Sequence, residues 1–119
     1  MHRISWYMAR TSADPGLLPG TLDLLILKTL SRSPLHGYGI AQQIKLVSSD
    51  VLQVEEGSLY PALQRLELKG LVESEWRMTP HKRRARVYRL SVAGRKRLAA
   101  AEAEFERLVG AVKRVLRPA

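Results

Sequence analysis

The sequence predicts an α+β fold that is mainly helical and carries a small β-hairpin. Three observations predict it. Short apolar stripes at helical spacing recur through residues 22–69, two extended runs follow in residues 71–90, and a heptad pattern fills residues 91–116. The chain has 119 residues and no cysteine, which fits one domain without disulfides or thiolate metal ligands. A domain of this size has room for one principal functional surface.

The first two helices are marked by their ends and by their apolar stripes. Thr21 can accept a free first-turn N–H, so we expect a helix over about 22–32. Ser33-Pro34 stops it, because proline cannot donate to the helical ladder. A second stripe predicts a helix over about 40–47.

The third helix is predicted to begin at Ser58, a good N-cap residue, and to end before Gly70. Pro61 then falls in the first turn, where a missing N–H costs little. The predicted outward face carries Tyr60, Gln64 and Arg65.

The second half of the chain predicts a hairpin and then a long helix. We expect strands at 71–76 and 86–90, separated by a long polar tip over 77–85. The helix over 91–116 would be about 37 Å long, which is more than this small domain can cover alone. We therefore expect a partner helix and a homodimer. The predicted dimerisation residues are Leu98, Ala101, Phe105, Leu108, Val112 and Val115.

The net charge of +9 is concentrated in the second part of the chain. Residues 1–76 hold 7 Lys/Arg against 8 Asp/Glu, whereas residues 77–119 hold 13 against 3. Residues 77–97 carry nine basic residues and no acidic one. A segment of one sign is either a solvated face or the binding surface for a polyanion.

Three short helices followed by a basic hairpin are typical of a winged helix-turn-helix domain. The major groove admits one helix, so the third helix can present its outward face to base edges. Gln64 can pair with adenine, and Arg65 with guanine or a phosphate. Ser58 and Tyr60 can donate to phosphate oxygens. The predicted grip on the DNA backbone comes from Lys82, Arg83, Arg84 and Arg86.

Four ordered blocks resemble the PadR family of bacterial transcription regulators. They are residues 18–27 (LPGTLDLLIL), 36–40 (HGYGI), 56–63 (EGSLYPAL) and 83–90 (RRARVYRL) with Gly94-Arg95. The single C-terminal helix resembles the smaller subgroup of the family. The resemblance implies a dimeric, operator-binding repressor. Carried over by position, the DNA-contacting residues are Ser58, Tyr60, Pro61, Gln64 and Arg65, with Arg83, Arg84 and Arg86 on the wing. Val87 stands where the family usually has an aromatic residue.

The implied organisation has three parts: an N-terminal arm or short helix over 1–16, a winged-helix domain over 17–90, and a dimerisation helix over 91–119. Because the resemblance starts near residue 17, Met8 is an alternative translation start to Met1. The family also implies a small aromatic or drug-like effector near the dimer interface. The candidate residues for that effector are Trp6, Trp76 and Phe105.

Other classes of function are less favoured by the residues. The chain has no phosphate-binding glycine loop and no nucleophile setting, so it is not expected to be an enzyme. His36 has no second ligand at metal spacing, so neither metal nor cofactor is predicted. No apolar stretch is long enough to cross a membrane, and we expect a cytoplasmic protein. A protein-interaction module and a structured-RNA binder remain the alternatives to duplex DNA.

Overall fold

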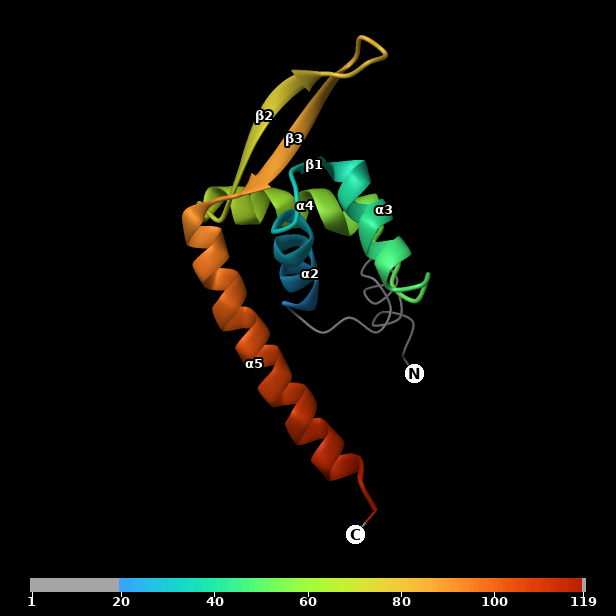
Figure 1. Cartoon of the computed structure of the whole chain (residues 1–119), viewed down its shortest axis with the longest axis vertical. Helices are drawn as coiled ribbons and strands as arrows, with labels where there is room; N and C mark the ends of the chain where they lie inside the picture. Colours follow the sequence, from blue (N-terminus) through green and yellow to red (C-terminus); the bar gives the residue numbers. More distant parts are fainter. Residues whose placement is uncertain (1–19, 119) are drawn as a thin grey trace, which may run out of the picture.

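The computed structural model describes residues 20–118, and the elements follow the predicted order (Figure 1). The predicted arm, with Trp6 and Met8, lies outside the described residues. The elements are α2 (Thr21–Leu30), β1 (Leu35–His36), α3 (Gly37–Val47), α4 (Glu56–Leu68), β2 (Val72–Met78), β3 (Arg84–Leu90) and α5 (Val92–Leu116). The mainly helical α+β class and the long C-terminal helix are confirmed. No helix among residues 20–118 has the length and apolarity that a membrane crossing requires.

The core forms where the three short helices meet the base of the sheet. Ile26 of α2, Ile40 of α3 and Leu59 of α4 are fully buried, because each lies on the apolar stripe of its helix. Val72 and Leu90 close the core from the sheet, and Leu98 closes it from α5. This core fixes α4 with its other face turned outward.

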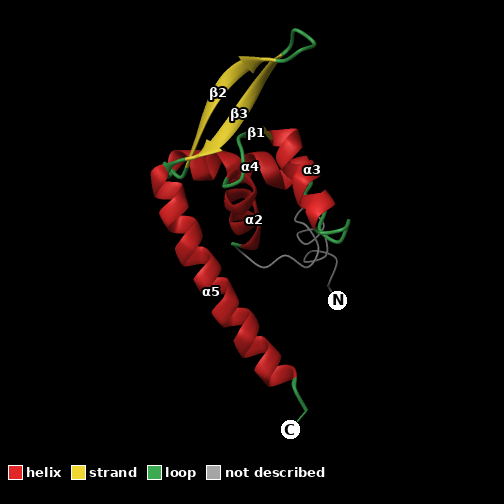
Figure 2. Cartoon of the chain, viewed as in Figure 1, coloured by secondary structure: helices red, strands yellow, loops and turns green. Residues whose placement is uncertain are grey.

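The sheet has three antiparallel strands in the order β1-β3-β2 (Figure 2). In the hairpin, Val72 is opposite Leu90 and Met78 is opposite Arg84. β1 was not expected: its two residues are too few to show a periodic pattern. Its pairing of Leu35 with Tyr88 ties the α2–α3 junction to the hairpin.

Three predicted helix starts were wrong. α2 begins at Thr21 with Gly20 as its N-cap, so Thr21 does not cap the helix. α4 begins at Glu56 and Glu55 is its N-cap, so Ser58 lies in the first turn and does not cap the helix. The Glu55 carbonyl accepts hydrogen bonds from the N–H groups of Ser58 and Leu59, at 3.0 and 2.9 Å. Pro61 consequently lies inside the helix, past the first turn. α3 begins at Gly37, earlier than its apolar stripe indicates.

The hairpin tip is shorter than predicted. β2 runs to Met78 and β3 starts at Arg84, so a tight turn replaces the expected long loop. The Thr79 carbonyl accepts a hydrogen bond from the Lys82 N–H at 2.9 Å, and the Thr79 N–H donates to the Arg83 carbonyl at 2.7 Å. Lys82 has φ of 62°, the left-handed conformation that follows such turns. The tip therefore holds its cations in a defined conformation.

The joint between the hairpin and α5 is closely packed. Ser91 caps α5 by accepting from the Gly94 N–H at 2.9 Å, and its hydroxyl donates to the Gly70 carbonyl at 2.6 Å. Gly94 is buried against the Leu71 carbonyl, which leaves no room for a side chain. The joint therefore connects the end of α4, the hairpin base and α5.

Candidate nucleic-acid interface

The outward face of α4 is exposed, as the predicted contacts require. Pro61, Gln64 and Arg65 are exposed, and Tyr60 is 42% exposed, while Ser58 is half-buried. Tyr60 and Arg65 are five residues apart, which places them about 140° apart around the helix axis. They therefore lie on opposite flanks of α4 with Gln64 between them, and the expectation that all three share one side was wrong.

Each flank of α4 has its own neighbour. A Cβ added to Gly37 would lie 2.6 Å from the Tyr60 ring, so Tyr60 leans on the start of α3. On the other flank, Arg65 Nη2 lies 3.0 Å from Asp23 Oδ1 of α2. Both side chains are thereby positioned by elements that precede α4 in the chain.

A cleft of about 1050 Å³ separates the hairpin from the beginnings of α3 and α4. Tyr38 and Tyr60 line its helical side, and Trp76, Arg83 and Arg84 line its hairpin side. Aromatic rings and guanidinium groups around an open cleft suit a ligand that is planar, anionic or both. The backbone and base edges of a nucleic acid have both properties.

The two faces of the hairpin differ in charge pairing. On the face that points away from α4, Arg89 contacts Glu73 and Glu75 at 3.0 and 2.9 Å, and Arg77 contacts Glu75 at 3.1 Å. These contacts lower the pKa of Glu75, chiefly through Arg77, and raise the pKa of Arg89, chiefly through Glu73. The charges of this face are thus balanced within the hairpin.

The other face of the hairpin is the one on which Tyr88 and Leu90 are buried. It carries arginine side chains around the indole ring of Trp76. Arg84 and Arg86 lie over the Trp76 ring, 4.9 and 5.6 Å from its centroid. Because side chains alternate along a strand, the burial of Tyr88 places both arginines on the α4 side. Burial also raises the pKa of the Tyr88 hydroxyl above its ordinary value.

Two side chains, Ser74 and Glu67, hold Arg86 by polar contacts. Its Nε donates to Ser74 Oγ at 2.8 Å, and its Nη2 lies 3.4 Å from Glu67 Oε2 of α4. The Ser74 hydroxyl donates to the same Glu67 oxygen at 2.6 Å. Arg86 therefore links the hairpin to α4.

The tip cations are not paired. Within residues 20–118, none of the ion pairs involves Lys82, Arg83 or Arg84. All three side chains are exposed. They form the part of the predicted grip whose charge no described residue neutralises through an ion pair.

His36 belongs to the cleft and is not among the predicted contacts. It caps α3, because its Nδ1 accepts a hydrogen bond from the Gly39 N–H at 3.0 Å. Its ring stacks on the Tyr38 ring, with the two ring centroids 6.5 Å apart. Histidine directly before a Gly-x-Gly helix start is the signal that could have indicated this cap. Among the described residues, no cluster of three His, Asp or Glu side chains could hold a metal ion.

The predicted dimerisation residues of α5 fall into two groups. Leu98 is 7% exposed and belongs to the chain's own core, and Ala101 is half-buried beside α2. The outer four are exposed; they are Phe105 at 37%, Leu108 at 47%, Val112 at 46% and Val115 at 83%. A hollow of about 270 Å³ between Leu24 of α2 and Leu108 adjoins them.

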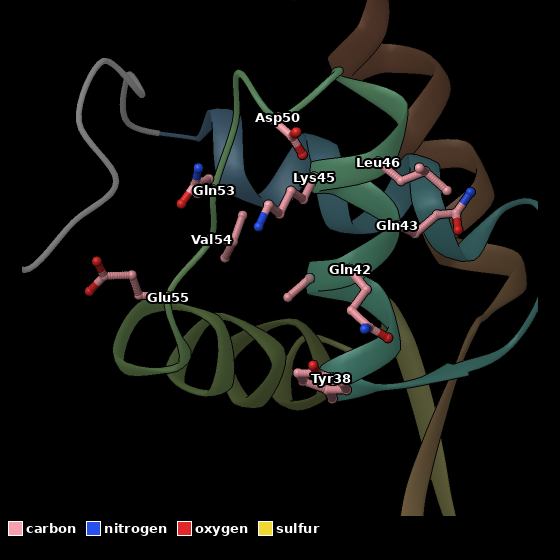
Figure 3. A pocket seen from close by; sticks show the side chains of 10 residues that line it. Tyr38, Gln42, Gln43, Lys45, Leu46, Asp50, Gln53, Val54 and Glu55 are labelled. Atoms are coloured by element: carbon pink, nitrogen blue, oxygen red, sulfur yellow. The ribbon is translucent and has the colours of Figure 1, made fainter.

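A further groove of about 630 Å³ lies on α3 and the segment that leads to α4 (Figure 3). Gln42, Lys45 and Asp50 give it a polar lining. It contains neither Trp76 nor Phe105, the described candidates for effector binding. Those two residues line different hollows of the protomer, so one protomer does not bring them together.

These features define a winged helix-turn-helix protein with an exposed third helix and a cationic wing. The family model of the transcriptional regulator PadR-like family matches residues 26–100, and the chain belongs to that family. The regulation of transcription through DNA binding follows from this membership.

Solved and curated relatives agree with this assignment. A transcriptional regulator from Clostridium thermocellum is 26% identical with a TM-score of 0.77, covering 83% of this chain and 96% of that one. A PadR family transcription regulator from Clostridium difficile is 28% identical with a TM-score of 0.71, covering 82% and 100%. The transcriptional regulator Rv3488 of Mycobacterium tuberculosis is 40% identical over 72 residues, which are 60% of this chain and 64% of that protein.

Proposed function

We propose that the protein is a dimeric repressor that binds a specific operator in duplex DNA in the cytoplasm. In this proposal α4 enters the major groove, and the hairpin tip lies on the neighbouring backbone. The observation that carries the proposal is the position of the unpaired tip cations, which lie across an aromatic cleft from the exposed face of α4. Of the proposed contacts, Tyr60 lines the cleft from α4, and Arg83, Arg84 and Arg86 line it from the hairpin.

The exposed apolar seam of α5 supports dimerisation. Phe105, Leu108 and Val112 form an apolar stripe that is exposed in the described part of the chain. A second copy of α5 would cover it, and two α4 helices could then enter successive major grooves about 34 Å apart. Replacing Leu108 by Glu is expected to give monomers in analytical ultracentrifugation while the monomer stays folded by circular dichroism.

The test of DNA binding is selection from a random duplex pool, followed by affinity measurements on the selected sequence. The three tip cations of each protomer would contact about six phosphates per dimer, so log K should fall with log salt with a slope of about −5. Replacing Lys82, Arg83 and Arg84 by alanine should remove most of this slope and leave the dimer intact.

Three outcomes contradict the proposal. Unchanged duplex affinity in the triple variant would favour a protein-interaction module. Tighter binding to RNA of the same sequence would favour an RNA-binding function. A pool that yields no enriched sequence would remove the specific operator.

A further inference from the structure

We infer that two carboxylates, Asp23 and Glu67, determine how well the protein distinguishes its operator from other DNA. The inference rests on the proposed DNA binding. The two residues lie on opposite flanks of α4 and each pairs with an arginine predicted to contact DNA. They were not predicted from the sequence.

Asp23 holds Arg65 by a single contact. Arg65 Nη2 donates to Asp23 Oδ1 at 3.0 Å, and the arginine side chain remains 54% exposed. A guanidinium has five N–H donors in one plane, so one bond to a carboxylate leaves the others available. The pair therefore presents an oriented donor set at the surface, with little net charge.

Glu67 holds Arg86 in the same manner on the other flank. One Glu67 oxygen accepts from Ser74 at 2.6 Å and faces Arg86 Nη2 at 3.4 Å, while Arg86 Nε donates to Ser74. The Arg86 side chain is still 43% exposed. This second arginine is also oriented and nearly neutralised.

Neutral, oriented pairs favour base edges over phosphates. A phosphate is recognised largely through charge and counterion release, and a neighbouring carboxylate opposes both. A base edge is uncharged and is recognised by the direction of its hydrogen bonds, which a fixed guanidinium satisfies. The carboxylates therefore suppress non-specific binding and preserve base contacts.

The hairpin tip provides the contrast within the same surface. Lys82, Arg83 and Arg84 form no ion pair among residues 20–118, and they serve any phosphate backbone equally well. At the flanks of α4, the two arginines are paired with carboxylates, and no described residue forms an ion pair with the three tip cations. This division is what the inference explains.

The experiment measures affinity for the selected operator and for a scrambled duplex with Asp23→Asn and Glu67→Gln. Each variant frees one arginine per protomer for a phosphate. At 0.15 M salt one added phosphate contact strengthens binding about fivefold, so two per dimer should strengthen scrambled-duplex binding about 25-fold. Operator affinity should rise far less, and the ratio of the two affinities should fall at least tenfold.

Glu73→Gln is the matched control, because it makes the same change of charge on the hairpin face that points away from α4. We expect it to change scrambled-duplex affinity less than twofold. A double variant completes the test: in an Arg65→Ala background, Asp23→Asn should have no effect on either affinity. That dependence separates an action through Arg65 from a structural role of Asp23.

Two results would overturn the inference. One is an equal gain in scrambled-duplex affinity from Glu73→Gln, which would indicate a general effect of charge. The other is an unchanged affinity ratio in Asp23→Asn and Glu67→Gln, with melting temperatures like that of the parent. If the parent protein itself shows no preferred duplex, the proposed function fails, and the measurement on the parent identifies that case before any variant is compared.

Discussion

Substituting Gly94 by alanine tests the joint between the hairpin and α5. The added Cβ would overlap the Leu71 carbonyl oxygen and lie 2.7 Å from Leu90 Cδ1. Backbone cannot rotate away as a side chain can, so we place the cost at the upper end of overpacking, about 3 kcal/mol. Alanine returns up to about 1 kcal/mol through its higher helix propensity. The expected net loss is therefore about 2 kcal/mol in the free energy of unfolding.

Urea unfolding followed by circular dichroism at a fixed protomer concentration measures this loss. For a domain of this size it corresponds to a melting temperature lower by about 10 °C. Gly57→Ala is the matched control, because a Cβ there meets no atom within 4 Å. The control should be as stable as the parent or slightly more stable. A Gly94→Ala protein with the parent's urea midpoint would refute the packing argument.

Three further predictions concern the cleft and the hairpin. Gly37→Ala should displace the Tyr60 ring, which lies 2.6 Å from the added Cβ, and weaken operator binding about tenfold by fluorescence anisotropy with little change in stability. Lys82→Gly should relieve the positive φ and stabilise the protein by about 1 kcal/mol in urea unfolding, while the salt slope of DNA binding becomes shallower. Burial raises the pKa of Tyr88, so its contribution to stability is complete below pH 10 and is lost as the pH rises through the folded-state pKa. Urea midpoints at pH 9 and 11, compared with those of Tyr88→Phe, should show this loss in the parent alone.

Periodicity predicted the helices well because burial and helical spacing coincide in them. Ile40 and Ile44 of α3 are buried, as are Leu59 and Leu63 of α4, at positions that the apolar stripes indicate. The ends of the elements were harder to predict. α4 starts at Glu56 because the Glu55 carbonyl accepts its first hydrogen bonds, and no side-chain cap marks that position.

The hairpin and the candidate site illustrate a second limit of prediction from the sequence. Some of their features depend on contacts between residues that are far apart in the chain. Met78 and Arg84 belong to strands although both faces of the hairpin are exposed there, so no alternation of polarity shows it. The pair of Asp23 and Arg65 joins residues 42 positions apart. Of the α4 candidates, Tyr60, Pro61, Gln64 and Arg65 are exposed and Ser58 is half-buried. The partners of these residues depend on packing that the order of residues does not display.

The alternation along β3 limits which insertions the wing can accept. Tyr88 and Leu90 are anchored in the core, and Arg84 and Arg86 share their side of the strand. One extra residue between Arg86 and Tyr88 would turn both arginines over to the acidic side, although no charged residue had been lost. Lengthening the turn would leave their orientation intact. Homologous wings should therefore differ in length at the turn and keep an even spacing between their arginines and the buried tyrosine.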